Sequence, residues 1–299
     1  MVVGLFRLLA WRTLDLTGPA ISSEGTMPRA KTEYVVANDG LPARVVGPWV
    51  ERKVWYVDRY AAIFASGMKN RWKRRAYVEL FAGPGVSFDR GHRQFIDGSA
   101  LRALSMAFTD WAFVDLDPKA TSALRQRITA RQRGAAATVI DGDCNQVIPQ
   151  LRAQVPADAL TLAFIDPTNW QVKLSTIAAL VESRHVDLLM TFHEGAMRRV
   201  GHLQDCNLDE FFDSGDWRKA LQRPHDQRLD ALLDLYNGKL EALGYLTSSS
   251  LRVPVKQKLT KGRVIYDLVL FSRHKRGIDF WQKAIGGTDE SGQIGLWTP

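Results

Sequence analysis

The sequence predicts an α/β fold: a Rossmann-like domain on a mostly parallel seven-stranded sheet, with a C-terminal antiparallel hairpin and a helical insertion. Three observations predict it. After residue 47, apolar runs typical of buried strands alternate with amphipathic helical segments. A long helical region then follows the fifth strand, and two further strand candidates come near the end of the sequence. Such alternation favours a parallel sheet with helices on both faces.

The first helix is predicted to begin at Gly47-Pro48, because proline suits the first turn of a helix. Apolar side chains then recur every three or four residues from Val50 to Met68, which marks one helical face. The basic segment KNRWKRR, residues 69–75, ends this helix, where the helix dipole favours cations.

The five parallel strands are predicted from near-continuous apolar runs, which indicate strands covered on both faces. They are Ala76–Ala82, Trp111–Leu116, Ala137–Ile140, Leu160–Ile165 and Val186–Phe192. Between the second and third of them, Asp117 is the expected N-cap of a helix with Pro118 in its first turn.

The region after the fifth strand changes character. Asn207–Gly244 is predicted to be helical, and Leu251–Lys258 and Val264–Ser272 are predicted to form a hairpin through the turn LTKGR. A short final helix is expected at GIDFWQKAI, residues 277–285. Five parallel strands followed by an antiparallel pair are typical of a class I methyltransferase domain.

The predicted organisation has three parts. Residues 1–34 are expected to be a disordered extension, or to result from an upstream start codon with the working start at Met27. Residues 35–285 form the methyltransferase-like domain, with the helical insertion at 200–245, and residues 286–299 form a C-terminal tail.

Composition narrows the class of protein. Of 299 residues, 45% are hydrophobic, which is enough for a sizeable core. The two cysteines, Cys144 and Cys206, exclude a disulfide scaffold and a four-cysteine zinc site, so a reducing, cytoplasmic location is expected. No apolar run approaches the ~18 residues of a membrane span. The histidines lack a ligand-like spacing, so no metal site is predicted.

Ligands of open α/β sheets bind at the carboxyl ends of the strands, so the functional residues are predicted there. The first strand ends in ELFAGPG, where Gly83 and Gly85 let the backbone approach a cofactor, with Phe81 and Ala82 in the same turn. Glu79 is expected either to brace the turn by accepting backbone N–H bonds or to receive a cationic group of the cofactor. The alternative interpretation is a simple tight turn.

The second strand ends in FVDLDP, where Asp115 is predicted to accept both hydroxyls of a ribose, with Leu116 beside it. Gly85 and Asp115 are 30 residues apart, whereas about 20 is typical of a dinucleotide fingerprint. A loop inserted before a helix that caps at Ser99 explains the interval. This spacing and the missing Gly-x-Gly-x-x-Gly argue against NAD(P).

The third and fourth strands also end in acids. In VIDGDCN, Asp143 is predicted to accept an adenine amine beside the Cys144 backbone, or alternatively to cap the next helix. In FIDPTNW, Asp166-Pro167 is predicted to hold the amino group of a planar acceptor while Trp170 stacks on its ring, or alternatively to form only a turn that ends the strand. Four consecutive strand ends therefore suit the parts of S-adenosyl-L-methionine (SAM), which is the predicted cofactor.

The fifth strand ends in MTFHEG, where His193 is predicted either to act as a base or to cap a helix. His193 and Glu194 are expected near Asp166, because parallel strands end at the same edge of a sheet.

Several of these motifs together resemble a known family. ELFAGPG, IDGSALRAL, FVDLD, GDCN, FIDP, FFDSGDW and FWQKAI resemble the three-Cys-motif partner (TcmP) proteins of bacteria, over residues 35–285. The resemblance implies a Rossmann-like methyltransferase fold and a small partner protein with three cysteines. It also supports the cofactor-side assignment of Gly83, Gly85, Asp115, Asp143 and Asp166. The chain departs from the family pattern where Thr168 and Asn169 precede Trp170.

Two functions follow as hypotheses, and a third is weaker. The first is a SAM-dependent methyltransferase that acts on a nucleic-acid base or nucleotide, RNA or DNA, because the net charge of +8 suits an anionic partner. Residues 69–75, Arg198 and Arg199 are then expected to contact phosphates. The alternative is a non-catalytic SAM-fold partner of the three-cysteine protein or of a phage-defence system. The weaker reading is an NAD(P) enzyme.

Overall fold

The computed structural model describes residues 32–131, 136–168, 170–200, 207–246, 252–256 and 264–286. The predictions for residues 1–31, for Asn169, for the turn LTKGR and for the tail beyond Gly286 lie outside them.

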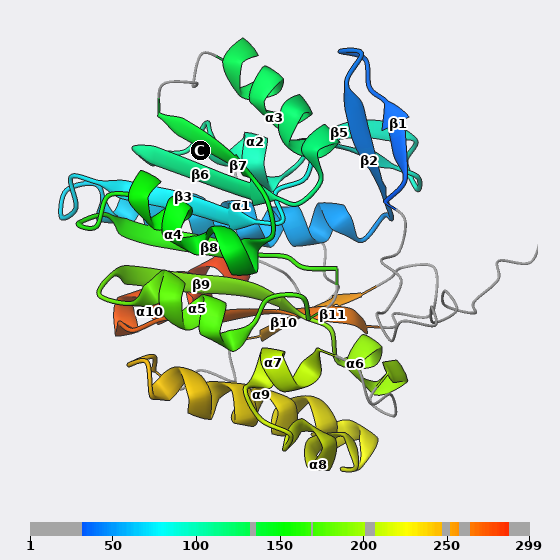
Figure 1. Cartoon of the computed structure of the whole chain (residues 1–299), viewed down its shortest axis with the longest axis vertical. Coiled ribbons are helices and arrows are strands. Elements are labelled where there is room, and N and C mark those ends of the chain that lie inside the picture. The colour runs from blue at the N-terminus through cyan, green and yellow to red at the C-terminus, as the bar shows by residue number, and fades with distance from the viewer. Residues whose placement is uncertain are drawn as a thin grey trace, which may run out of the picture. The chain divides into compact units, whose positions relative to one another are not determined.

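The central sheet contains seven strands in the order β10-β11-β9-β8-β3-β6-β7 (Figure 1). Five of them are parallel, and β11 (Val264–Phe271) lies antiparallel between β9 and β10 (Arg252–Lys256). The parallel strands are β3 (Arg75–Leu80), β6 (Asp110–Asp115), β7 (Ala137–Asp141), β8 (Leu160–Ile165) and β9 (His185–Phe192). The predicted Rossmann-like methyltransferase topology is confirmed, and each of these strands lies within two residues of its predicted bounds.

Helices cover both faces of this sheet. One face carries α1 (Val50–Met68), α2 (Ser99–Ala103), α3 (Pro118–Ala130) and α10 (Lys275–Ile285), whose buried side chains share one apolar cluster with β3, β8 and β9. The other face carries α4 (Cys144–Gln154) and α5 (Leu174–Val181), which contact each other. Helix α1 begins two residues after the predicted Gly47-Pro48, and residues 69–75 follow its end rather than forming its last turn.

Helices also occupy the predicted insertion. They are α7 (Leu208–Phe212), α8 (Trp217–Leu221) and α9 (His225–Glu241), and α6 (Glu194–Val200), which was not predicted, precedes them. An aromatic cluster fixes α7 and α9 to the sheet: the rings of Phe211 and Tyr236 stack 4.9 Å apart, and Tyr236 also contacts Phe192 and Phe271. Alternation along β9 directs Phe192 to the face opposite the α1 cluster.

A second sheet was not predicted. It has four strands in the order β1-β2-β4-β5, namely β1 (Tyr34–Val36), β2 (Pro42–Val46), β4 (Val86–Asp89) and β5 (Gln94–Asp97). The loop expected at 86–98 is therefore a hairpin, and ordered structure already includes Tyr34. The buried guanidinium of Arg127 in α3 joins this sheet to the first strand end, because it donates to the carbonyls of Pro42 and Pro84.

None of the described helices combines the length and the hydrophobicity that spanning a bilayer requires.

Candidate functional site at the carboxyl ends of the strands

The order of the strands reverses between β3 and β8, so the crevice outside their carboxyl ends is the expected ligand position. The turn after β3 is unusual in its backbone. Phe81, Gly83 and Gly85 all have positive φ, at 75°, 63° and 85°. A positive φ is costly for a residue with the bulk of phenylalanine, and such strain gathers at functional sites when the surroundings impose it. Here the backbone N–H groups of Phe81 and Ala82 both donate to the carbonyl of Val114 in β6.

Asp115 continues this bracing. Its carboxylate accepts from the backbone N–H of Gly83 at 2.7 Å and from that of Asp117 at 2.9 Å. The half-buried carboxylate thus fixes the glycine turn relative to the end of β6. Next to it, Leu116 is 42% exposed, which is unusual for a leucine at the tip of a buried strand. Asp115 and Leu116 therefore both lie at the crevice. Asp117 is the N-cap of α3, as predicted, because its side chain accepts from the backbone N–H of Lys119.

The two glycines serve different purposes. A Cβ at Gly85 would lie 2.9 Å from Leu101 and Leu124, so this position must be small for α2 and α3 to pack. Gly83 is also buried, yet a Cβ there would meet no atom within 4 Å. Gly83 is therefore a buried position with open space on the side where a Cβ would lie.

Glu79 is buried in β3 and 2% exposed. The expected backbone N–H donors are wrong: its carboxylate accepts from the hydroxyls of Tyr77, at 3.1 Å, and Ser99, at 2.6 Å. Gly98 rather than Ser99 is the N-cap of α2. Burial raises the pKa of Glu79 to about 8, against the opposing effect of the two hydroxyls. Glu79 thus ties β3 to the start of α2, and its carboxyl group is protonated at neutral pH.

Asp143 caps the next helix, which was the alternative prediction for this residue. It is the N-cap of α4 and accepts from the backbone and side-chain amides of Asn145. Cys144 is 4% exposed, and burial raises the pKa of its thiol to about 12, so it is not a nucleophile at neutral pH. Asp143 lies after β7, two strands from β3 along the same edge of the sheet.

Asp166, directly after β8, forms an ion pair with Lys53 of α1. The side chains of Lys53 and Asp166 are 13% and 20% exposed. Burial alone would raise the pKa of Asp166, but the charge and hydrogen bond of Lys53 outweigh it and hold the pKa below its ordinary value. Pro167 is buried, and Trp170 is 5% exposed. The expected stacking face of Trp170 is therefore packed against protein and is not presented to a ligand.

Two further side chains, His193 and Tyr266, lie near the ion pair of Lys53 and Asp166. Their rings are 5.0 Å apart, and Lys53 Nζ lies 5.8 Å from the centre of the Tyr266 ring. Burial lowers the pKa of His193 to about 4, and the nearby Lys53 charge adds to this effect. The imidazole is therefore neutral and donates to the Pro167 backbone, which leaves Nε2 as an acceptor.

Several polar atoms of His193, Tyr266 and their neighbours have no hydrogen-bond partner within the described residues. They are Nε2 of His193, the hydroxyl oxygens of Tyr266 and Thr191, and Oε1 of Glu194. Buried polar atoms without partners are rare in folded proteins, and such atoms at a strand edge are typical of groups that bind a ligand. We refer to Lys53, Asp166, His193 and Tyr266 as the polar group.

Lys53 and Tyr266 were missed from the sequence. Lys53 had a usable signal, because it lies three residues after Val50 and four before Val57, within the apolar face of the helix. Tyr266 had none, because a tyrosine in an apolar strand is ordinary.

The basic segments divide between the two edges of the sheet. Residues 69–75 lead into the amino end of β3, so they lie at the edge opposite the glycine turn and the polar group. This segment therefore does not lie beside the candidate site, and its contact with phosphates stays a prediction. Arg198 and Arg199 are exposed in α6, which directly follows the carboxyl end of β9.

Comparisons with known proteins give a limited result. No protein-family model matches the chain, and no curated protein matches it. Among solved structures, the chain is similar to an O-methyltransferase from Bacillus cereus in complex with SAH (10% identity, 76% of this chain and 80% of that one, TM-score 0.44). It is also similar to M. jannaschii TYW2 in complex with AdoMet (11%, 83% and 88%, TM-score 0.43). A SAM-dependent methyltransferase from Thiobacillus denitrificans in complex with S-adenosyl-L-homocysteine is a third (15%, 76% and 70%, TM-score 0.35). The fold assignment depends on the strand order described above.

Proposed function

We propose that the protein is a SAM-dependent methyltransferase. The observation that carries the proposal is the glycine turn after β3, which is held in a strained conformation by Asp115 and borders open space at Gly83. The turn lies at the position where open α/β sheets bind nucleotides. A positive φ at Phe81, in addition to those of the two glycines, costs conformational energy. Binding of a cofactor by this backbone conformation would explain why the strain is kept.

The residues of the edge fit the parts of SAM. The turn at Phe81–Gly85 would hold the methionine part, and Asp115 has carboxylate lone pairs left for the ribose hydroxyls. Leu116 offers exposed apolar surface to the adenine, and Asp143 a carboxylate to its amine. When bound, SAM supplies a methyl group already activated by its sulfonium, so the chain has chiefly to position the acceptor.

The polar group is the proposed acceptor side. Asp166 is engaged by Lys53, so an acceptor amine held by Asp166 must share or displace that cation. His193 is the better candidate to take the proton that an acceptor loses, because its ring is neutral and no described residue forms a hydrogen bond with its Nε2. Pro167 fixes the ring, and Tyr266 packs beside it. These roles replace the predicted pairing of Asp166 with a stacking Trp170.

The proposed substrate class is a nucleic-acid base or nucleotide. The net charge of +8 supports an anionic partner, and the exposed Arg198 and Arg199 lie at the edge that bears the site. A partner with three cysteines is proposed on the resemblance of the sequence motifs alone.

Calorimetric titration with SAM and with S-adenosylhomocysteine tests the cofactor. Asp115→Ala should weaken both by at least about tenfold, because it removes a ribose contact and the brace of the turn. Asp110→Ala is the matched control, since Asp110 begins the same strand at the opposite edge and pairs with Arg74 there. Absence of binding, or equal affinity in the two variants, contradicts the proposal.

If SAM binds, transfer of a labelled methyl group to total RNA and to DNA tests the acceptor. His193→Gln should lower the rate of transfer and leave SAM affinity unchanged. Unaltered transfer in this variant would remove His193 from the acceptor side.

A further inference from the structure

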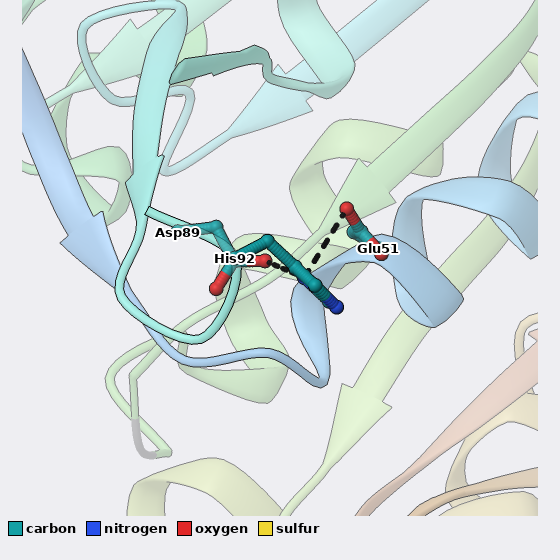
Figure 2. Close-up of side chains that lie close together, drawn as sticks. All are labelled: Glu51, Asp89 and His92. Carbon is teal, nitrogen blue, oxygen red and sulfur yellow. Dashed lines mark hydrogen bonds and ion pairs between the residues drawn. The ribbon is translucent and has the colours of Figure 1, made fainter. Parts of the chain in front are cut away.

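Three side chains of the kinds that ligate metals converge at the junction of helix α1 with the second sheet (Figure 2). Glu51 lies in the first turn of α1, Asp89 ends β4, and His92 lies in the turn that follows. Nδ1 of His92 is 2.7 Å from Oδ2 of Asp89 and 3.6 Å from Oε1 of Glu51. One ligand atom from each residue lies within 4.8 Å of the others.

Within the described part of the chain, no lysine or arginine forms an ion pair with the two carboxylates of this triad. Asp89 is fully buried, and among the ion pairs of the described residues its partner is His92. Glu51 likewise pairs with His92. A neutral imidazole leaves two carboxylates close together, one of them out of contact with water, and such an arrangement is costly without a cation. A divalent ion between the three side chains would neutralise both carboxylates.

Hydrogen bonds hold the triad in place both at the end of β4 and in the first turn of α1. Asp89 accepts from the backbone N–H of Gly91 at 2.7 Å, and Gln94 donates to Oε1 of Glu51 at 2.9 Å. The turn itself packs on the start of α1, because a Cβ at Gly91 would lie 2.7 Å from Pro48. Hydrogen bonds to ligating carboxylates orient them and increase metal affinity.

We propose that Glu51, Asp89 and His92 bind a divalent transition-metal ion such as Zn²⁺. One imidazole and two carboxylates form a nitrogen and oxygen donor set that Zn²⁺ accepts, with water in the remaining position. The side chains of His92 and Glu51 are 52% and 41% exposed, so both an ion and its water can enter from solvent. No spacing in the sequence indicates the site, because its residues come from a helix and a hairpin that only the fold brings together.

Calorimetric titration of the metal-free full-length protein with ZnCl₂ and with MnCl₂ tests this site. We expect saturable Zn²⁺ binding that is tighter than Mn²⁺ binding, following the general order of divalent affinities. His92→Ala and Glu51→Gln should each weaken Zn²⁺ binding by more than about tenfold, and His225→Ala, which removes an exposed histidine at the start of α9, should not.

Co²⁺ as an optical probe gives a second measurement, because its visible absorption reports the ligands directly. His92→Ala should change that spectrum, and His225→Ala should preserve it. Thermal unfolding with a chelator present should leave Glu51→Gln close to the wild type, since that side chain is 41% exposed. His92→Ala should lose some stability, because the buried Asp89 loses its ion-pair partner. Absence of saturable Zn²⁺ binding, or equal affinities in wild type and both triad variants, overturns the proposal. The test is independent of SAM binding.

Discussion

Lys53 of α1 forms an ion pair with Asp166, the residue that follows β8, and the pair lies where the strand order of the main sheet reverses. Through this pair the first helix is joined to the strand end that carries the Asp-Pro motif. The lysine also sets the electrostatics of its neighbours: it holds the pKa of Asp166 down and contributes to the low pKa of His193. Lys53 thus keeps the carboxylate charged, whereas burial is the main cause that keeps the imidazole neutral, with Asp166 opposing it and Lys53 adding to it.

Lys53→Met should lower the free energy of unfolding by roughly 3 kcal/mol, because it leaves Asp166 as a mostly buried charge without a partner. Lys53→Met combined with Asp166→Leu should lose less than the sum of the single changes, with a coupling of about 1–3 kcal/mol. Urea denaturation of the wild type, the two single variants and the double variant measures this coupling energy. The pair of Lys239 with Asp213 is the control: these side chains are 33% and 75% exposed, and their coupling should stay below about 1 kcal/mol. Additive losses at Lys53 and Asp166 would contradict the interpretation.

Gly83→Ala should separate backbone strain from cofactor binding. A Cβ at Gly83 meets no atom within 4 Å, so the cost to stability should be that of a left-handed backbone, about 1–2 kcal/mol. Gly40→Ala is closely matched, since Gly40 has φ of 77° and equally open surroundings in the β1–β2 turn. Both variants should lose similar stability in thermal unfolding, and only Gly83→Ala should lose SAM affinity in calorimetry. Equal SAM affinity in the two variants would argue against a cofactor at the turn.

Glu79 should make stability depend on pH. Its pKa is about 8 in the folded protein, against an ordinary value of 4.5. Between these values the native state keeps a proton that the unfolded chain has lost, so its contribution to stability decreases as pH rises from about 5 to about 8. The slope is at most about 1.4 kcal/mol per pH unit for one proton. Glu79→Gln should remove this slope, as urea denaturation across that range would measure. A difference between the two proteins that stays constant with pH would show that Glu79 is ionised in the native state.

The main sheet was predictable because its strands are long, apolar and covered on both faces, which leaves a clear signal in the sequence. The second sheet was not. Its strands are three to five residues long and only partly buried, and β2 pairs with β4 across more than forty residues of sequence. A run as short as VSFD does not distinguish a strand from a loop.

Some residues of the candidate site could likewise be located from the sequence, and others could not. Glu79, Asp115, Asp143 and Asp166 were found because strand ends can be located in a sequence, and parallel strands bring their ends to one edge. Their partners could not be found, because Lys53 reaches Asp166 across 113 residues. Trp170 was predicted from its place in a motif, but motif position does not determine whether a ring faces a ligand or the core.

Arg198 and Arg199 provide the last prediction, since the fold separates them from the other basic segment. Both follow the carboxyl end of β9, whereas residues 69–75 precede β3 at the far edge. Replacing both arginines with alanine should weaken binding of a short RNA. It should also reduce the slope of log affinity against log salt by about 1.4, or ~0.7 for each lost phosphate contact on a single strand.

Lys69→Ala combined with Arg71→Ala removes the same charge from the opposite edge and is the matched control. Its salt slope should stay close to that of the wild type, because a substrate at the site does not reach that edge. Filter binding at several salt concentrations would measure all three proteins. If the control lost as much affinity and slope as the arginine variant, the RNA would be held by net charge in general, and the substrate class proposed for this edge would lose its support.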